Sequence, residues 1–197
     1  PKANLKDASQ ADSLSYAIGV AQAQGLKDYL VARMGMDTTY MNQFVDGLLE
    51  GVEANDKKTA YYAGIQIGQQ EATQVIPGIT GEVFGGKNVE MNKKNYVDGF
   101  MAGVTEKGQK MDPALAQETA MALMQSLKNS NDSTANFAAQ VDTFSYAIGL
   151  ARTQGLKEYA MQRLGVDSAY YVSEFAKGIK EGFNMDEDAK KGAFILR

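Results

Sequence analysis

A long motif occurs twice in this chain. Residues 12–19 read DSLSYAIG and residues 142–149 read DTFSYAIG. An ungapped comparison of residues 12–40 with 142–170 gives 16 identities in 29 positions. After one inserted residue the likeness continues, with Phe44, Gly47 and Gly51 corresponding to Phe175, Gly178 and Gly182. Duplication on this scale indicates a helical unit used more than once, and it favours a role in packing and assembly over a reaction centre.

Composition narrows the functional classes. The 197-residue chain has a formal net charge of -4 with acids and bases interspersed, so it lacks the basic patch that nucleic-acid binding requires. Cysteine, histidine and tryptophan are all absent. Their absence removes disulfides, thiolate nucleophiles, the commonest general base and the commonest transition-metal ligands. We therefore expect no catalytic residues, no metal and no cofactor.

Apolar spacing and capping residues predict an all-α bundle of repeated helix-turn-helix units. The first helix is predicted from Asp12 or Ser13 to Met34, with Gly35 as its stop. Asp37 and Asp56 are predicted to cap the next two helices.

The middle of the chain is less regular. Residues 76–89 contain Pro77, Gly78, Gly81, Gly85 and Gly86, which predict a loop or a short hairpin packed back onto the helices. Further helices are predicted over 91–104 and from the Asp112-Pro113 pair onward. The second copy repeats the caps, with Gly165 as stop and Asp167 as restart.

Glycines spaced four residues apart recur on the predicted helices. A glycine inside a helix costs about 1 kcal/mol relative to alanine, so each pair needs a compensating benefit, and close approach of a second backbone supplies one. The helix faces that carry these glycine pairs pack against another helix either within one subunit or between subunits. Together with aromatic residues of the repeated motif, they form our candidate packing or interface residues: Tyr16, Gly19, Phe44, Gly47, Gly51, Gly64, Gly68, Gly99, Gly103, Tyr146, Gly149, Phe175, Gly178 and Gly182.

Ten methionines and ten tyrosines allow a second interpretation. Methionine at helical spacing is typical of a core, but an adaptable methionine-rich surface also suits the binding of unfolded chains. Both interpretations stay open at this point.

The motif pattern resembles a known helical module. Ser-Tyr-Ala-Ile-Gly followed by Phe-x-x-Gly-(Leu/Ile)-x-x-Gly, over 15–51 and 145–182, is similar to the N-terminal domain of FKBP-type peptidyl-prolyl isomerases of the macrophage-infectivity-potentiator kind. A weaker third occurrence starts at Tyr62 and resumes at Tyr96. The resemblance implies dimerisation and chaperone-like holding of unfolded or partly folded clients. Isomerisation would belong to a separate barrel domain, whose motifs this chain lacks.

The resemblance and the repeats together give a domain plan. We expect a flexible segment over 1–11, a first unit over 12–128 containing the weaker repeat 57–128, a polar connector over 129–141, and a truncated second copy over 142–197. The copies would pair as a homodimer or as an internal pseudo-dimer. The alternative is a stand-alone secreted helical binding protein without an isomerase domain.

The start of the chain bears on its location. It begins at Pro1 without an initiator methionine. A cleaved secretion or lipoprotein signal would explain this, as would an artificial start. We expect a protein that is secreted to the periplasm or associated with the outer membrane. Its only contact with a membrane would be through a lipid anchor on a segment that precedes Pro1 and is absent from this sequence.

Overall fold

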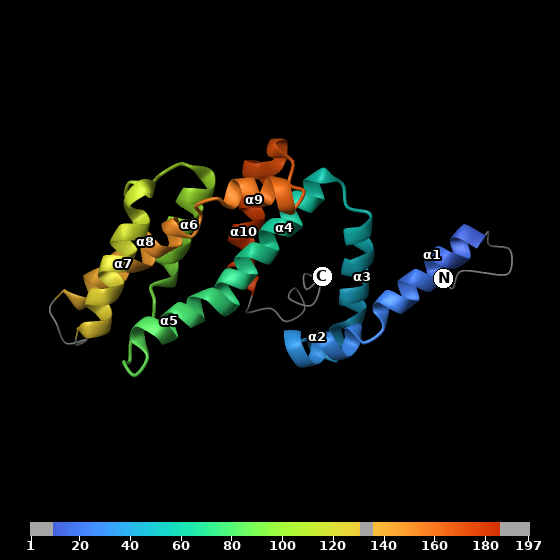
Figure 1. Ribbon diagram of the computed structural model, residues 1–197, viewed down its shortest axis with the longest axis horizontal. Helices are drawn as coiled ribbons and strands as arrows, with labels where there is room; N and C mark the ends of the chain where they lie inside the picture. Colours follow the sequence, from blue (N-terminus) through green and yellow to red (C-terminus); the bar gives the residue numbers. More distant parts are fainter. Residues whose placement is uncertain (1–9, 131–135, 186–197) are drawn as a thin grey trace.

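The computed structural model describes residues 10–130 and 136–185, and this part of the chain is α-helical without a β-strand. The predicted all-α class is therefore confirmed. The helices are α1 (Gln10–Ala23), α2 (Leu26–Met34), α3 (Met41–Val52), α4 (Asp56–Gln70), α5 (Ile76–Phe84), α6 (Lys93–Thr105), α7 (Pro113–Asn129), α8 (Phe137–Ala151), α9 (Leu156–Arg163) and α10 (Ala176–Gly182). Figure 1 shows α1 to α3 at one end of an elongated molecule and α5 to α8 at the other, with α4, α9 and α10 between them.

Three segments of this layout are named units below. Unit 1 covers residues 10–52, unit 2 covers 56–105 and unit 3 covers 137–182. Each contains a first glycine-bearing helix (α1, α4 or α8) and a second one (α3, α6 or α10).

Most of the core lies in units 2 and 3. The largest fully buried side chains of the described residues are aromatic and aliphatic, and only Leu127 on α7 and Phe183 just after unit 3 lie outside the two units: Tyr96, Phe84, Phe100, Phe144, Phe175, Phe183, Ile65, Leu127, Leu150 and Ile179. Unit 1 has only a small separate cluster, built from Leu30, Met36 and Phe44. The hydrophobic stabilisation of the fold is therefore concentrated between units 2 and 3.

Several predicted boundaries are confirmed. Gly35 ends α2 with a left-handed φ of 66°. Asp37 and Asp167 each accept a hydrogen bond from a backbone N–H two residues on. Asp112 caps α7 in the same way, directly before Pro113. These short polar side chains satisfy N–H groups that a helix start leaves without partners.

Other boundaries were wrong. The long first helix is split at Gly25, whose φ of 76° breaks it into α1 and α2. Helix α1 already includes Gln10 and Ala11, so the flexible segment predicted over 1–11 is wrong at its end; residues 1–9 lie outside the described part. Asn55, rather than Asp56, caps α4 by accepting from the Lys58 N–H. Helix α8 begins at Phe137, so the end of the predicted connector 129–141 is helical, while residues 131–135 lie outside the described part.

The loop or hairpin predicted for 76–89 is also wrong over most of its length. Residues Ile76–Phe84 form α5, which continues from α4 through a π-helical turn, Glu71–Val75. Pro77 lies directly after this π-helical turn, where the regular α-helical hydrogen-bond ladder is already interrupted, and this position accommodates its missing N–H. The irregular backbone is confined to the residues after Phe84.

Candidate functional site

Helices α4 and α10 cross at four glycines. A Cβ atom built on Gly64 would overlap the Phe175 carbonyl oxygen and lie 2.9 Å from the Ile179 amide nitrogen. A Cβ on Gly178 would overlap the Tyr61 carbonyl and lie 2.9 Å from the Ile65 amide. Gly68 and Gly182 make the corresponding contacts one turn further on. Backbone therefore lies directly on backbone, which only glycine permits.

Helices α6 and α8 repeat this geometry. A Cβ on Gly99 would overlap the Tyr146 carbonyl oxygen, and one on Gly149 would overlap the Tyr96 carbonyl. In both crossings the obstructing carbonyl belongs to the residue three positions before the glycine of the opposing helix. The nearest amide nitrogen belongs to the residue that follows that glycine. Gly149 thus occupies the same place in its crossing as Gly64, and Gly99 the same place as Gly178. Gly103 differs, because its hydrogen faces the Thr153 side chain rather than backbone.

The serine and tyrosine of the repeated motif support the second crossing. The Ser145 hydroxyl accepts a hydrogen bond from the Asn92 N–H at 3.0 Å, just before α6 begins. The Tyr146 hydroxyl accepts from the Lys110 N–H at 2.8 Å, in the loop between α6 and α7. Both residues of the motif therefore bind the segments that flank α6, which is a packing role.

Unit 1 presents the same motif without a partner helix. Nothing lies within 4 Å of a Cβ built on Gly19. Leu14 is 62% exposed and Val20 48%, whereas the corresponding Phe144 and Leu150 in α8 are 0% and 1% exposed. Tyr16 and Gly51 are exposed as well, while Phe44 and Gly47 are buried. Helix α1 contains no buried residue. It extends away from the rest of the molecule in Figure 1.

An ionic cluster around the buried Glu71 joins units 2 and 3. The Glu71 carboxylate, 5% exposed, accepts hydrogen bonds from the Arg152 Nε at 3.0 Å and Nη2 at 2.8 Å, and from the Tyr96 hydroxyl at 2.7 Å. Burial lowers the pKa of Arg152, but its hydrogen bonds and charge interactions with Glu71 and Tyr96 together outweigh burial and leave the pKa raised. Burial and the adjacent carboxylate raise the pKa of Tyr96. Glu71 and Tyr96 are buried, whereas the Arg152 side chain is 39% exposed, so the cluster lies at the edge of the core.

Polar contacts also link the helix pairs at their edges. The Tyr61 hydroxyl on α4 donates to Glu181 on α10, and burial followed by this hydrogen bond raises the Tyr61 pKa. The Tyr62 hydroxyl donates to Glu50 on α3, which also pairs with Lys58 at 2.9 Å. The second contact attaches unit 1 to unit 2.

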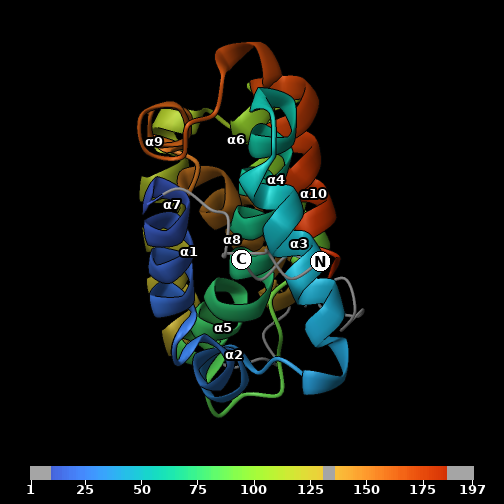
Figure 2. The ribbon, with the colours of Figure 1, turned by 90° about the vertical axis from the view of Figure 1, so that its right-hand side faces the viewer.

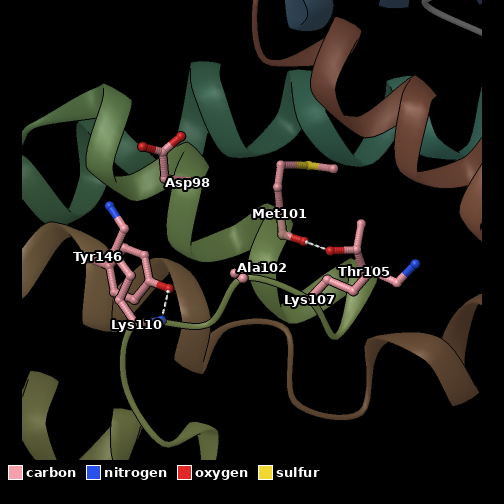
Figure 3. Close-up of a pocket in the computed structure, with 8 residues that line it drawn as sticks. Asp98, Met101, Ala102, Thr105, Lys107, Lys110 and Tyr146 are labelled. Atoms are coloured by element: carbon pink, nitrogen blue, oxygen red, sulfur yellow. Dashed lines mark hydrogen bonds between the residues drawn. The ribbon is translucent and has the colours of Figure 1, made fainter.

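The hollow at the end of α6 is shallow and polar. It measures about 280 Å³ and lies beside Asp98, Met101, Lys107, Lys110 and Tyr146. Figure 3 shows the Tyr146 hydroxyl directed at the Lys110 backbone and the Thr105 hydroxyl bonded to the Met101 carbonyl. Its polar groups stabilise the helix end, so the hollow is best explained as part of the crossing.

A larger groove of about 570 Å³ lies between units 1, 2 and 3. Its apolar lining comes from Met34 on α2, Ile67 on α4, and Tyr159 and Leu164 at α9. The polar lining includes Arg33 and four glutamines of α4 and the turn after it. Mixed amide and apolar walls suit a polypeptide segment, which offers backbone amides and side chains together.

Neither the ionic cluster nor the groove follows from the sequence patterns. One signal for the cluster was present: Arg152 follows the largely apolar segment 144–151, where unit 1 has Gln22. The groove has no such signal, because its lining residues come from three helices that are distant in sequence.

The described residues show no group of acidic side chains arranged to hold a metal ion, and no helix among them is long and apolar enough to cross a membrane. Comparison with protein-family models, with curated proteins and with solved structures finds no match to this chain.

Proposed function

We propose that this chain is a noncatalytic helical module for assembly and for chaperone-like binding of protein clients, of the kind that accompanies FKBP-type peptidyl-prolyl isomerases. The observation that carries the proposal is the contrast between α1 and α8, which share a motif but differ completely in burial. Four large apolar side chains of α1 are exposed: Leu14, Tyr16, Ile18 and Val20. A concentration of exposed apolar side chains is typical of an interaction surface.

The groove supplies a site for clients. Met34 and Tyr159 offer adaptable apolar contacts at its walls, and Tyr159 is about half exposed. Methionine tolerates varied partners because its unbranched side chain repacks at low cost. The side-chain amides of Gln69, Gln70 and Gln74 also line the groove. An amide can donate hydrogen bonds to a bound backbone and accept hydrogen bonds from it. We expect weak binding with little sequence preference.

Insulin aggregation induced by dithiothreitol tests the proposal. The chain contains no cysteine, so the reductant leaves it unchanged. An equimolar amount of the chain should delay the rise in light scattering. Tyr159→Ser and Ile67→Ser should shorten this delay, whereas Val172→Ser should not, because Val172 is exposed but does not line the groove. Unchanged aggregation at a tenfold excess of the chain would refute client binding.

A further inference from the structure

We infer that a hollow between units 2 and 3 binds a primary ammonium group on a flexible alkyl chain, supplied by a free alkylamine or by a lysine side chain. The inference goes beyond the proposed function, because this hollow shares no lining residue with the groove proposed for clients. Its volume is about 390 Å³, which is enough for a small ligand. A buried hydroxyl without a partner and two carboxylates without a cation carry the inference.

The hollow lies where segments distant in sequence meet. The loop after α6 contributes Glu106 and Gln109, the turn between α8 and α9 contributes Gln154, and α9 contributes Glu158. Tyr171 lines the hollow from the π-helical turn before α10. Figures 1 and 2 both show α6 next to α9, at the end of the molecule opposite α2. The packing of units 2 and 3 therefore assembles the site.

Tyr171 directs an unpartnered hydroxyl into this hollow. The residue is 4% exposed, and its ring stacks on Phe175. Among the described residues, none forms a hydrogen bond with this hydroxyl. Burial raises the pKa of Tyr171 most, and the charges of Glu106 and Glu158 raise it further, so both carboxylates lie near the hydroxyl. A buried polar group normally has a hydrogen-bond partner, and its lack here indicates a ligand.

The hollow carries more negative than positive charge. Its charged side chains are Glu106, Glu158 and Lys157. Neither carboxylate forms an ion pair within the described part of the chain. The Lys157 ammonium lies instead over the Tyr171 ring, 5.3 Å from its centroid. Two carboxylates and one hydroxyl thus remain as acceptors, which matches the three N–H donors of a primary ammonium group. A metal ion fits less well, because the described residues hold no group of three or more acidic side chains that could bind one.

The backbone at Glu106 supports a role for its side chain. Glu106 has a φ of 57°, the only positive φ at a non-glycine position among the described residues. Glycine is the favoured residue in this left-handed conformation, because a Cβ atom makes it strained. A glutamate at this position, beside an unpartnered hydroxyl, is explained by a carboxylate that contacts a ligand.

The π-helical turn that contains Tyr171 coincides with an insertion. Four residues separate Tyr170 from Phe175, whereas three separate Tyr40 from Phe44 at the corresponding place in unit 1. Unit 1 continues there as the regular helix α3, but unit 3 accommodates the extra residue as a π-helical turn. Single π-helical turns of this kind are frequent at functional sites. The insertion therefore falls at the wall of the hollow.

Amide chemical shifts measured by two-dimensional NMR test the inference. The probes are n-pentylamine, n-pentanol, which has the same chain without the charge, and the methylamide of Nα-acetyl-lysine. Pentylamine should shift the amide signals of Gly103, Thr153 and Tyr171, with a Kd on the order of 1 mM for so small a ligand. Pentanol should leave them unchanged. Equal shifts with both probes, or no shift with pentylamine at roughly ten times that Kd, would overturn the inference.

The lysine derivative distinguishes the two sources of the ammonium group. Shifts as large as those with pentylamine would support a lysine side chain of a protein as the ligand. Shifts with pentylamine alone would support a free alkylamine, because the backbone amides of the lysine derivative are then excluded from the hollow.

Four variants separate binding from folding. Tyr171→Phe keeps the ring and Glu158→Gln keeps the shape of the side chain, and each should weaken pentylamine binding about fivefold. Glu106→Gly should weaken it similarly at an unchanged or higher melting temperature, because glycine relieves the left-handed backbone. Glu118→Gln, on α7 and outside the hollow, should bind as the wild type does. If the first three variants bind as tightly as Glu118→Gln, the inference is wrong.

Discussion

Replacement of Gly178 by alanine tests close backbone approach at the α4 and α10 crossing. Alanine has the higher helix propensity, which alone would stabilise α10 by about 1 kcal/mol. The new methyl group would overlap the Tyr61 carbonyl oxygen, lie 2.9 Å from the Ile65 amide nitrogen and lie 3.1 Å from the Tyr61 carbonyl carbon. These are backbone atoms, so the whole of α4 must move.

Movement of α4 would also loosen the three neighbouring glycine contacts, which places the cost at the upper end of the usual range for overpacking, about 3 kcal/mol. The net loss should be about 2 kcal/mol. For a chain of this size that lowers the melting temperature by about 4–8 °C.

Gly81→Ala is the matched control. Gly81 lies inside α5 without a positive φ, and nothing is within 4 Å of a Cβ built there. The same substitution should therefore stabilise the chain, by up to about 1 kcal/mol. Urea unfolding followed by circular dichroism at 222 nm compares the two variants. If Gly178→Ala is as stable as Gly81→Ala, the close-approach explanation of the glycine pairs is wrong.

Two further predictions follow from the buried tyrosines and from the proposed lack of catalysis. Burial raises the pKa of Tyr171 to about 12, and the pKa values of Tyr61 and Tyr96 are raised as well. Because the pKa in the folded state exceeds the unfolded value near 10, these tyrosines contribute their full stabilisation below pH 10. That stabilisation is lost as the pH rises towards 12. Urea midpoints from pH 8 to 12 should fall over that interval and fall less in Tyr171→Phe, and a tyrosinate absorbance at 295 nm that titrates entirely near pH 10 would contradict this. The isolated chain should not accelerate cis-trans isomerisation of an X-Pro peptide in a protease-coupled assay, and turnover that scales with chain concentration would refute the noncatalytic proposal.

Local signals in the sequence were sufficient for many elements. Gly35, Asp37 and Asp167 act through their own backbone and the next few residues, so their roles are readable from the sequence. The error at residues 76–84 has a different origin. Pro77, Gly78 and Gly81 lower helix propensity, but the buried side chains of this helix pack into the core, and this tertiary packing outweighs the local preference: Ile76, Val83 and Phe84.

Which units pack against each other could not be derived from the sequence repeat alone. The repeat relates unit 1 to unit 3. The helices of unit 3 nevertheless pack against those of unit 2, whose sequence is less similar to unit 3. The glycine pattern is common to all three units and so does not choose among them. Side chains outside the motif do distinguish the units: Glu71, in the π-helical turn after α4, pairs with Arg152 of unit 3, where unit 1 has Gln22.

The Glu71 and Arg152 pair offers a quantitative test of that choice. Arg152→Gln gives unit 3 the residue of unit 1 and leaves the 5% exposed Glu71 with the Tyr96 hydroxyl but no cation. Loss of one partner from a buried ion pair costs about 3–5 kcal/mol, and the loss here should lie near the lower end, because the Arg152 side chain is 39% exposed and water can reach Glu71 once it is shortened. Glu71→Gln combined with Arg152→Gln removes both charges and should recover more than half of that loss. A double-mutant cycle from urea unfolding measures the coupling between the two sites. Additive effects of the two substitutions would show that the pair does not act as a unit, and the selection of unit 3 over unit 1 would then need another cause.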